Sequence, residues 1–144
     1  MKRSALSRHP LNICLAAAIA SFGLIMPAAR ADEIWMADGK MVQWLESKGD
    51  TAVFKMNNVY FYIEGLTYNS ERATHTGYWV TRTNAQRRCA TFREFHGERS
   101  SYTWGRFRIR FIGDSFPYKW VAKLGECDGK VYKTMNAIPM MQAD

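Results

Sequence analysis

Arginine recurs at every second position within residues 101–112 (SYTWGRFRIRFI). On a β-strand this alternation places three guanidinium groups on one face, about 7 Å apart, because each residue rises by about 3.3 Å. A guanidinium group binds carboxylates and phosphates through paired hydrogen bonds, so such a face could hold an anionic partner. The alternation consists of Arg106, Arg108 and Arg110 on one side and Phe107, Ile109 and Phe111 on the other.

The segment 72–110 concentrates this kind of charge. It contains nine arginines and no lysine, against only Glu94 and Glu98. Two interpretations stay open at this point. In the first, one of the glutamates lies opposite the arginines and the face is simply solvated. In the second, the arginines form a recognition face for an anionic ligand.

Aromatic residues offer a second possible contact. Tyr78 and Trp79 are adjacent, so on a strand they point to opposite faces and one of them could be exposed beside Arg82. An exposed ring next to a cation suits stacking against a sugar or a contact with a protein. Core filling is the alternative for each tryptophan of a strand.

Residues typical of catalysis lack the context that catalysis needs. His75 lies in a threonine-rich segment, and Ser70 has no GxSxG sequence around it. His75 and His96 do not have a spacing typical of metal ligands, and no glycine-rich phosphate loop is present. The sequence therefore predicts a binding protein rather than an enzyme, with no metal and no cofactor.

The first 31 residues have the pattern of a secretory signal. A basic start precedes a mostly apolar stretch over 11–27, and residues 29–31 (ARA) form a small–x–small cleavage site. We therefore expect a mature chain that begins at Asp32 and resides in the periplasm. An uncleaved anchor is the alternative, although the apolar stretch is short for a membrane span.

Export changes the charge balance. The whole chain of 144 residues has 20 basic and 13 acidic residues, and four of the basic ones lie in the expected signal. The mature chain of 113 residues then has 16 basic residues against the same 13 acids, a net charge of +3. This modest charge and an extracytoplasmic location argue against nucleic acid as the partner.

Two cysteines remain after the expected cleavage, Cys89 and Cys127. An even pair in an oxidising compartment predicts one disulfide. Closing a loop of nearly 40 residues would stabilise the fold by about 3–4 kcal/mol on the chain-entropy estimate.

The mature chain has a hydrophobic period of two nearly throughout, with turn residues every eight to twelve positions. We expect a single all-β domain over 32–135, a small antiparallel barrel or sandwich of about eight strands, and a loose tail over 136–144. Asn57-Asn58 predicts a two-residue hairpin. A change of phase at Gly105 predicts a bulge. The expected strands are 41–45, 51–56, 59–63, 66–69, 77–83, 87–95, 101–112, 116–124 and 131–135.

The segment 70–82 (SERATHTGYWVTR) resembles the small periplasmic or membrane-bound inhibitors of c-type lysozyme. The upstream VFKMNNVYFYIEGL resembles the hairpin that precedes this stretch in the family. The resemblance implies an exported β-barrel with a disulfide whose loop residues enter a muramidase cleft. The expected contact residues are Ser70, Arg72, Tyr78, Trp79 and Arg82.

Three functions follow from these observations. The leading one is inhibition of a peptidoglycan hydrolase or lysozyme-type muramidase by blocking its acidic cleft; a bacterial hydrolase with an acidic surface suits this basic chain best. The second is an envelope module that binds lipopolysaccharide or peptidoglycan through the arginine strand. The third, a hydrolase, would depend on His75 or Glu94.

Overall fold

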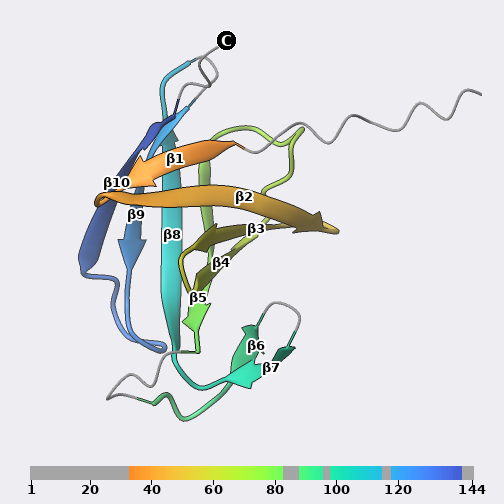
Figure 1. Ribbon diagram of the computed structural model, residues 1–144, viewed down its shortest axis with the longest axis vertical. Helices are drawn as coiled ribbons and strands as arrows, with labels where there is room; N and C mark the ends of the chain where they lie inside the picture. The colour runs from red at the N-terminus through yellow and green to blue at the C-terminus, as the bar shows by residue number, and fades with distance from the viewer. Residues whose placement is uncertain (1–32, 83–87, 96–97, 115–117, 141–144) are drawn as a thin grey trace, which may run out of the picture.

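The computed structural model describes residues 33–82, 88–95, 98–114 and 118–140 (Figure 1). The expected signal, residues 1–31, lies outside this part of the chain. Among the described residues there is no helix that is long and apolar enough to cross a membrane. The strands are β1 (Ile34–Ala37), β2 (Lys40–Lys48), β3 (Thr51–Met56), β4 (Val59–Glu64), β5 (Thr74–Thr81), β6 (Arg93–Phe95), β7 (Glu98–Ser101), β8 (Trp104–Ile112), β9 (Lys119–Leu124) and β10 (Lys133–Pro139).

Eight of these strands close into an antiparallel barrel in the order β1-β10-β9-β8-β5-β4-β3-β2. The short strand β1 closes the barrel because it pairs with β2 along one edge and with β10 along the other. Closure gives every barrel strand a partner on both sides. The prediction of an all-β antiparallel fold of about eight strands is confirmed, and the fold is the barrel rather than the sandwich.

Side chains fill the interior of the barrel, as its width allows for eight strands. Trp35 stacks on Phe54 with ring centroids 5.1 Å apart and meets Trp120 edge-on at 6.0 Å. Each fully buried large side chain stabilises the fold by about 1.5–3 kcal/mol. The largest of them in the interior are Trp35, Trp44, Trp120, Phe54, Phe61, Ile63, Leu66 and Ile109.

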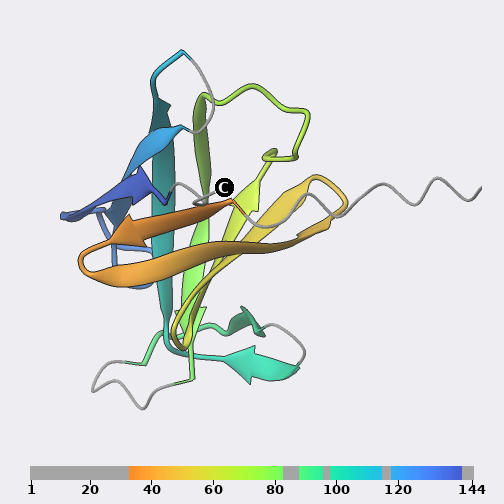
Figure 2. The same ribbon diagram turned by 45° about the horizontal axis from the view of Figure 1, so that its top comes forward.

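A second apolar cluster lies on the outer face of the barrel. Trp104 is only 2% exposed although it shares the phase of Arg106, because the segment that contains β6 and β7 packs over it. Figure 2 shows β6 and β7 as a separate hairpin at the end of the barrel where β5 stops. The cluster consists of Val53, Tyr62, Val80, Cys89 and Trp104.

The bulge predicted at Gly105 is wrong, and the second cluster explains how Trp104 is buried without it. The pairing of β5 with β8 runs from Val80↔Trp104 through Trp79↔Gly105 without a shift of register. A bulge is not needed to bury Trp104, because an additional layer of chain covers the outer face at this point.

Several predicted strands differ from the observed ones. The hairpin at Asn57-Asn58 is confirmed, since Met56 pairs with Val59 across it and Asn57 has a φ of 53°. A strand over 66–69 is wrong, because these residues form part of a loop. Of the strand expected over 87–95, only β6 is observed. Residue 87, where that expected strand begins, lies outside the described part.

The end of the chain is also different from the prediction. The last strand begins at Lys133 rather than at residue 131 and continues to Pro139, so residues 136–139 belong to the barrel instead of a loose tail. Ala137 is buried and pairs with Ala37 of β1. The physical reason is that β1, which the sequence did not indicate, offers this segment an edge to pair with; residues 141–144 lie outside the described part.

Candidate anion-binding site

Strand β8 carries a row of cations on its outer face, here called the arginine row. All three members are exposed, whereas the residues between them are buried in the barrel. Thr76 of β5 lies beside Arg108 on one side, and Lys123 of β9 lies directly opposite it on the other. The sheet therefore sets one cation against another. The arginine row consists of Arg106, Arg108 and Arg110.

The described residues offer little negative charge to this row. No described carboxylate lies within ion-pair distance of Arg108 or Arg110. Glu94, one of the two expected counter-charges, contacts Lys48 instead, with Nζ and Oε1 3.3 Å apart. The side chain of Glu98 lies outside the described part of the structure.

Arg106 differs from the other two members, because its Nε lies 3.8 Å from Oδ1 of Asp128. The two side chains are 60% and 66% exposed. An ion pair this long and this exposed contributes little, since water and salt screen it. Arg106 therefore keeps most of its capacity to bind an anion.

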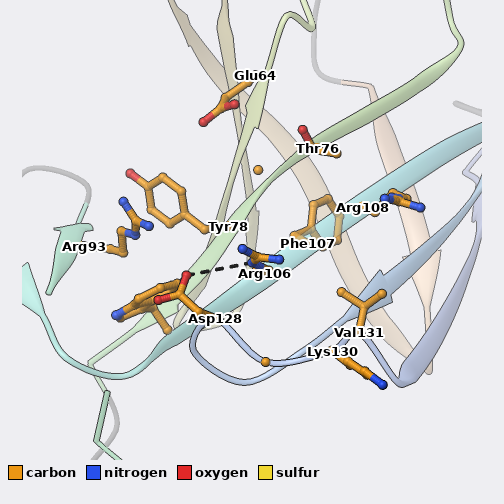
Figure 3. Close-up of a pocket in the computed structure, with 13 residues that line it drawn as sticks. Glu64, Thr76, Tyr78, Arg93, Arg106, Phe107, Arg108, Asp128, Lys130 and Val131 are labelled. Atoms are coloured by element: carbon orange, nitrogen blue, oxygen red, sulfur yellow. Dashed lines mark ion pairs between the residues drawn. The ribbon is translucent and has the colours of Figure 1, made fainter. Parts of the chain in front are cut away.

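A hollow with a volume of about 710 Å³ adjoins the arginine row (Figure 3). Its lining contains four cations and two carboxylates, so positive charge is in excess. Arg93 and Lys130 complete the cations of the lining. Arg106 and Arg108 are the other two cations, the carboxylates are Glu64 and Asp128, and Thr76 and Tyr78 belong to the same lining.

One wall of the hollow is fastened to β8 by backbone hydrogen bonds. The amide of Cys127 donates to the carbonyl oxygen of Trp104 at 2.9 Å, and that of Gly125 donates to the oxygen of Arg106 at 2.9 Å. A Cβ atom at Gly105 would overlap the carbonyl oxygen of Gly125. Glycine at this position lets the two segments approach, and this approach places Asp128 beside the row.

The disulfide Cys89–Cys127 fixes the same wall from its other side, with Cα atoms 5.4 Å apart. The predicted pairing is thus confirmed. The bond links the segment that covers Trp104 to the segment that borders the hollow. Two parts of the chain that are far apart in sequence are held together next to the arginine row.

Aromatic rings lie under one of the cations of the hollow. The guanidinium carbon of Arg93 lies 4.4 Å from the ring centroid of Trp104 and 5.5 Å from that of Tyr78. Tyr78 stacks on Tyr62, with centroids 4.8 Å apart. Burial raises the pKa of Tyr78 to about 12, and nearby carboxylates add to this effect. The phenol is therefore protonated at neutral pH and can donate a hydrogen bond.

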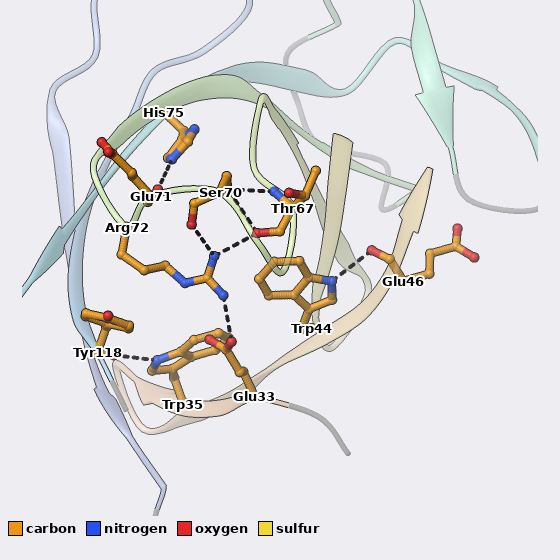
Figure 4. A network of polar contacts seen from close by, with 10 residues as sticks. All are labelled: Glu33, Trp35, Trp44, Glu46, Thr67, Ser70, Glu71, Arg72, His75 and Tyr118. Atoms are coloured by element: carbon orange, nitrogen blue, oxygen red, sulfur yellow. Dashed lines mark hydrogen bonds and ion pairs between the residues drawn. The ribbon is translucent and has the colours of Figure 1, made fainter. Parts of the chain in front are cut away.

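The residues expected to form a contact loop do not come together. Ser70 and Arg72 lie at the end of the barrel where β5 begins, and Figure 4 shows them in a local polar network. Oγ of Ser70 donates to the carbonyl oxygen of Thr67 at 2.9 Å and accepts from the amide of Thr67 at 2.8 Å. This hydroxyl stabilises the turn.

Arg72 is directed into the structure. Its side chain is 8% exposed; one Nη donates to Glu33 and the other to the carbonyl oxygen of Thr67, both at 2.8 Å. The guanidinium carbon also lies 5.2 Å from the ring centroid of Trp44. Arg72 closes the end of the barrel, so its placement does not support the expected role as a partner contact.

The remaining three residues of the expected loop lie on or just after β5. Tyr78 is on the outer face and lines the hollow. Trp79 packs against the interior core, and its Nε1 donates to the carbonyl oxygen of Gly125 at 2.8 Å. Arg82 is exposed beyond the end of β5. Only Tyr78 therefore belongs to the site.

His75, one of the two residues on which an enzyme would depend, is the second residue of β5, at the end of the barrel where this strand begins. Its Nδ1 is 3.3 Å from the carbonyl oxygen of Glu64, and its Nε2 is 3.1 Å from that of Glu71. One ring nitrogen thus faces a backbone oxygen at the end of β4 and the other faces one in the loop that follows. In the described part of the chain, no group of three or more His, Cys, Asp or Glu side chains could hold a metal ion.

Three residues of the site were not predicted from the sequence: Lys123, Glu64 and Asp128. For Lys123 a signal existed, since the turn at Gly113-Asp114 predicts a hairpin that places the next strand beside the arginines. For Glu64 and Asp128 no local signal existed, because they reach the hollow only through pairing and the disulfide.

Comparison of the chain with models of protein families, with curated proteins and with solved structures gives no match. Any function must therefore be derived from the geometry of the arginine row and the hollow.

Proposed function

We propose that this protein is a periplasmic binding module that holds an anionic polymer of the cell envelope, lipopolysaccharide or peptidoglycan, on a cationic face of its barrel. The cationic face is the arginine row together with Lys119 and Lys123 of β9. One observation carries the proposal. Arg108 lies directly opposite Lys123, and the described residues give neither Arg108 nor Arg110 a carboxylate partner.

Like charges opposite one another destabilise a sheet. An anion bound between the two cations would attract both and offset their repulsion, so the arrangement favours occupancy by negative charge. The barrel holds the strands rigidly, and each guanidinium group can donate two parallel hydrogen bonds to a carboxylate or a phosphate. A polymer that repeats such groups could contact successive arginines, which are about 7 Å apart along β8.

The periplasmic setting rests on the signal-like pattern of residues 1–31 and on the disulfide. An oxidising compartment maintains a disulfide, whereas cytosolic thiols are kept reduced. Both features support a location beside the polymers of the envelope.

The test is binding of the purified protein to isolated peptidoglycan and to lipopolysaccharide, measured for the wild type and for R108S/R110S. Removing one charge-assisted hydrogen bond to the polymer should cost about 1.5 kcal/mol or more, so affinity should fall by at least about tenfold. Binding should also weaken with added salt, because the cations are exposed.

Lys40→Ser is the matched control. Lys40 is exposed on β2, which lies across the barrel from β8, so its replacement removes a cation without touching the cationic face. We expect binding of this variant to stay within about twofold of the wild type, since β2 and β8 are opposite each other in the barrel order and salt screens charges over such a span. Equal binding by R108S/R110S and the wild type would eliminate the proposal.

Inhibition of a muramidase is the second candidate, because a cleft lined by carboxylates could also bind the uncompensated arginines. On this hypothesis a muramidase assay would show inhibition by the wild type and no inhibition by R108S/R110S. Absence of inhibition of both host and bacterial muramidases at large molar excess would remove it.

A further inference from the structure

Glu64 is a carboxylate of the hollow that has no ion-pair partner among the described residues. Its carboxylate is exposed at the end of β4, and no described cation lies within ion-pair distance of it. Figure 3 shows this side chain on one side of the hollow, with Arg106 and Arg108 on the other. Two charges of opposite sign thus border the same space without contacting each other.

The strand order explains the separation. Ile63 pairs with Gly77, and Thr76 pairs with Arg108, so β5 lies between Glu64 and Arg108. Neighbouring strands are about 4.8 Å apart, which separates the two backbones by about 10 Å. The side chain between the charges is the short Thr76, which leaves room above the sheet for a ligand.

We infer that the hollow binds a dipolar group: an ammonium next to a carboxylate or phosphate, the ammonium on Glu64 and the anion on Arg106 and Arg108. This inference rests on the proposed function and narrows it to envelope polymers that carry free primary amines beside their anionic groups. The amine decides specificity, and the arginine row supplies the general attraction to polyanions.

The surroundings of the two charges fit such a ligand. The hydroxyl of Thr76 lies between them, and Tyr78 offers a protonated phenol in the same lining. Asp128 already faces Arg106 at 3.8 Å, whereas no described carboxylate lies within ion-pair distance of Arg108, so Arg108 is freer than Arg106 to bind an anion. No described cation pairs with Glu64, so its carboxylate can accept a ligand's ammonium.

The experiment compares native polymers with the same polymers after their amines are acetylated. Peptidoglycan and amine-bearing lipopolysaccharide serve as two arms that identify the source of the dipolar group. Acetylation removes positive charge from the polymer, so general attraction to a basic protein would become stronger. The inference expects the reverse: about tenfold weaker binding by the wild type to at least one acetylated polymer.

Glu64→Gln tests the protein side of the contact. The variant should bind the native polymer about as weakly as the wild type binds the acetylated one, and acetylation should not weaken its binding further. Glu71→Gln, an exposed glutamate outside the hollow, is the matched control and should retain the wild-type preference for free amines. Thermal unfolding of both variants ensures that folded proteins are compared.

Dextran sulfate, a polyanion without amines, separates this inference from the proposed function. Its binding should depend on Arg108 and Arg110 but should not decrease in Glu64→Gln. If the wild type bound acetylated polymers as tightly as native ones, or more tightly, the inference that the hollow binds a dipolar group would be rejected. The proposed function would be unaffected. Failure to bind any polyanion would overturn the proposed function itself.

Discussion

Arg72 and Glu33 form a buried ion pair that closes one end of the barrel. Their Nη2 and Oε1 atoms are 2.8 Å apart, and the two side chains are 8% and 11% exposed (Figure 4). The two residues are 39 positions apart in the sequence, so the pair connects the residue before β1 with the loop between β4 and β5. Arg72, which the sequence led us to expect in a binding loop, thus lies in a structural contact.

Arg72→Met should destabilise the protein by about 3–5 kcal/mol, because it leaves the carboxylate of Glu33 buried without its partner. Urea denaturation measures the destabilisation. Replacing both residues by Met should recover at least half of the lost stability, because no unpaired charge is then buried. In the wild type, Nε of Arg72 and Oε2 of Glu33 are buried without hydrogen-bond partners, so the double variant also removes two unsatisfied polar atoms.

Folded Arg72→Met should bind anionic polymers as the wild type does. A large decrease in affinity at full folding would instead restore Arg72 as a contact residue and contradict its assignment as a structural residue.

Tyr62→Phe should be neutral or stabilising by about 1 kcal/mol at pH 7, since the buried hydroxyl of Tyr62 lacks a hydrogen-bond partner within the described structure. A clear destabilisation in chemical denaturation would reveal a partner for the hydroxyl.

The same residue should govern stability in alkali. Burial raises the pKa values of Tyr62 and Tyr78 above the ordinary value of about 10, to about 12 for Tyr78. Because the folded state favours the protonated phenols, their contribution is fully present below pH 10 and is lost as the pH rises toward 12. The free energy of unfolding between pH 9 and about pH 12 should therefore fall less steeply for Tyr62→Phe than for the wild type, as denaturation curves would measure.

Removing the disulfide with C89A/C127A should lower the free energy of unfolding by about 3 kcal/mol, because the unfolded chain is then no longer constrained by a closed loop. The variant should also bind polyanions less tightly, since the wall that carries Asp128 and Lys130 is then held by hydrogen bonds alone. Denaturation and binding with and without a reductant measure both effects, and a reductant should not alter the variant.

Gly105→Ala should destabilise the protein by about 2–3 kcal/mol, because the new methyl group would overlap the carbonyl oxygen of Gly125 and displace the hydrogen bond from Trp79. Denaturant unfolding measures the destabilisation, and tryptophan fluorescence of the native state should report the displaced indole. A variant as stable as the wild type would mean that the two segments can separate at little cost.

The alternation in β8 shows what sequence reasoning can achieve. Side chains on a strand alternate between two faces, so the exposure of Arg108 and the burial of Ile109 follow from order in the sequence alone. The Asn57-Asn58 hairpin depends on residues that tolerate positive φ, and the disulfide depends on an even number of cysteines. The alternation and the turn depend on neighbouring residues and the disulfide on a count of cysteines, so all three were predicted correctly.

Apart from the disulfide, the contacts between distant segments discussed above were not predicted. Trp104 is buried as expected, but the cause is a segment that covers the outer face and not the predicted bulge at Gly105. In the sequence Arg72 has the character of a partner contact, but in the fold Glu33 and aromatic rings at the barrel end surround its guanidinium group. Residues 136–139 join the barrel because β1 offers them an edge.

The sequence by itself determined the strands with the clearest alternation, the β class and the cationic side of β8, since each depends on residues close together in the chain. Tertiary structure alone decided that Lys123 faces Arg108 and that Glu64 borders the same hollow. The physical reason is that register and closure bring together strands that are far apart in the sequence, and no local pattern records which charges then become neighbours.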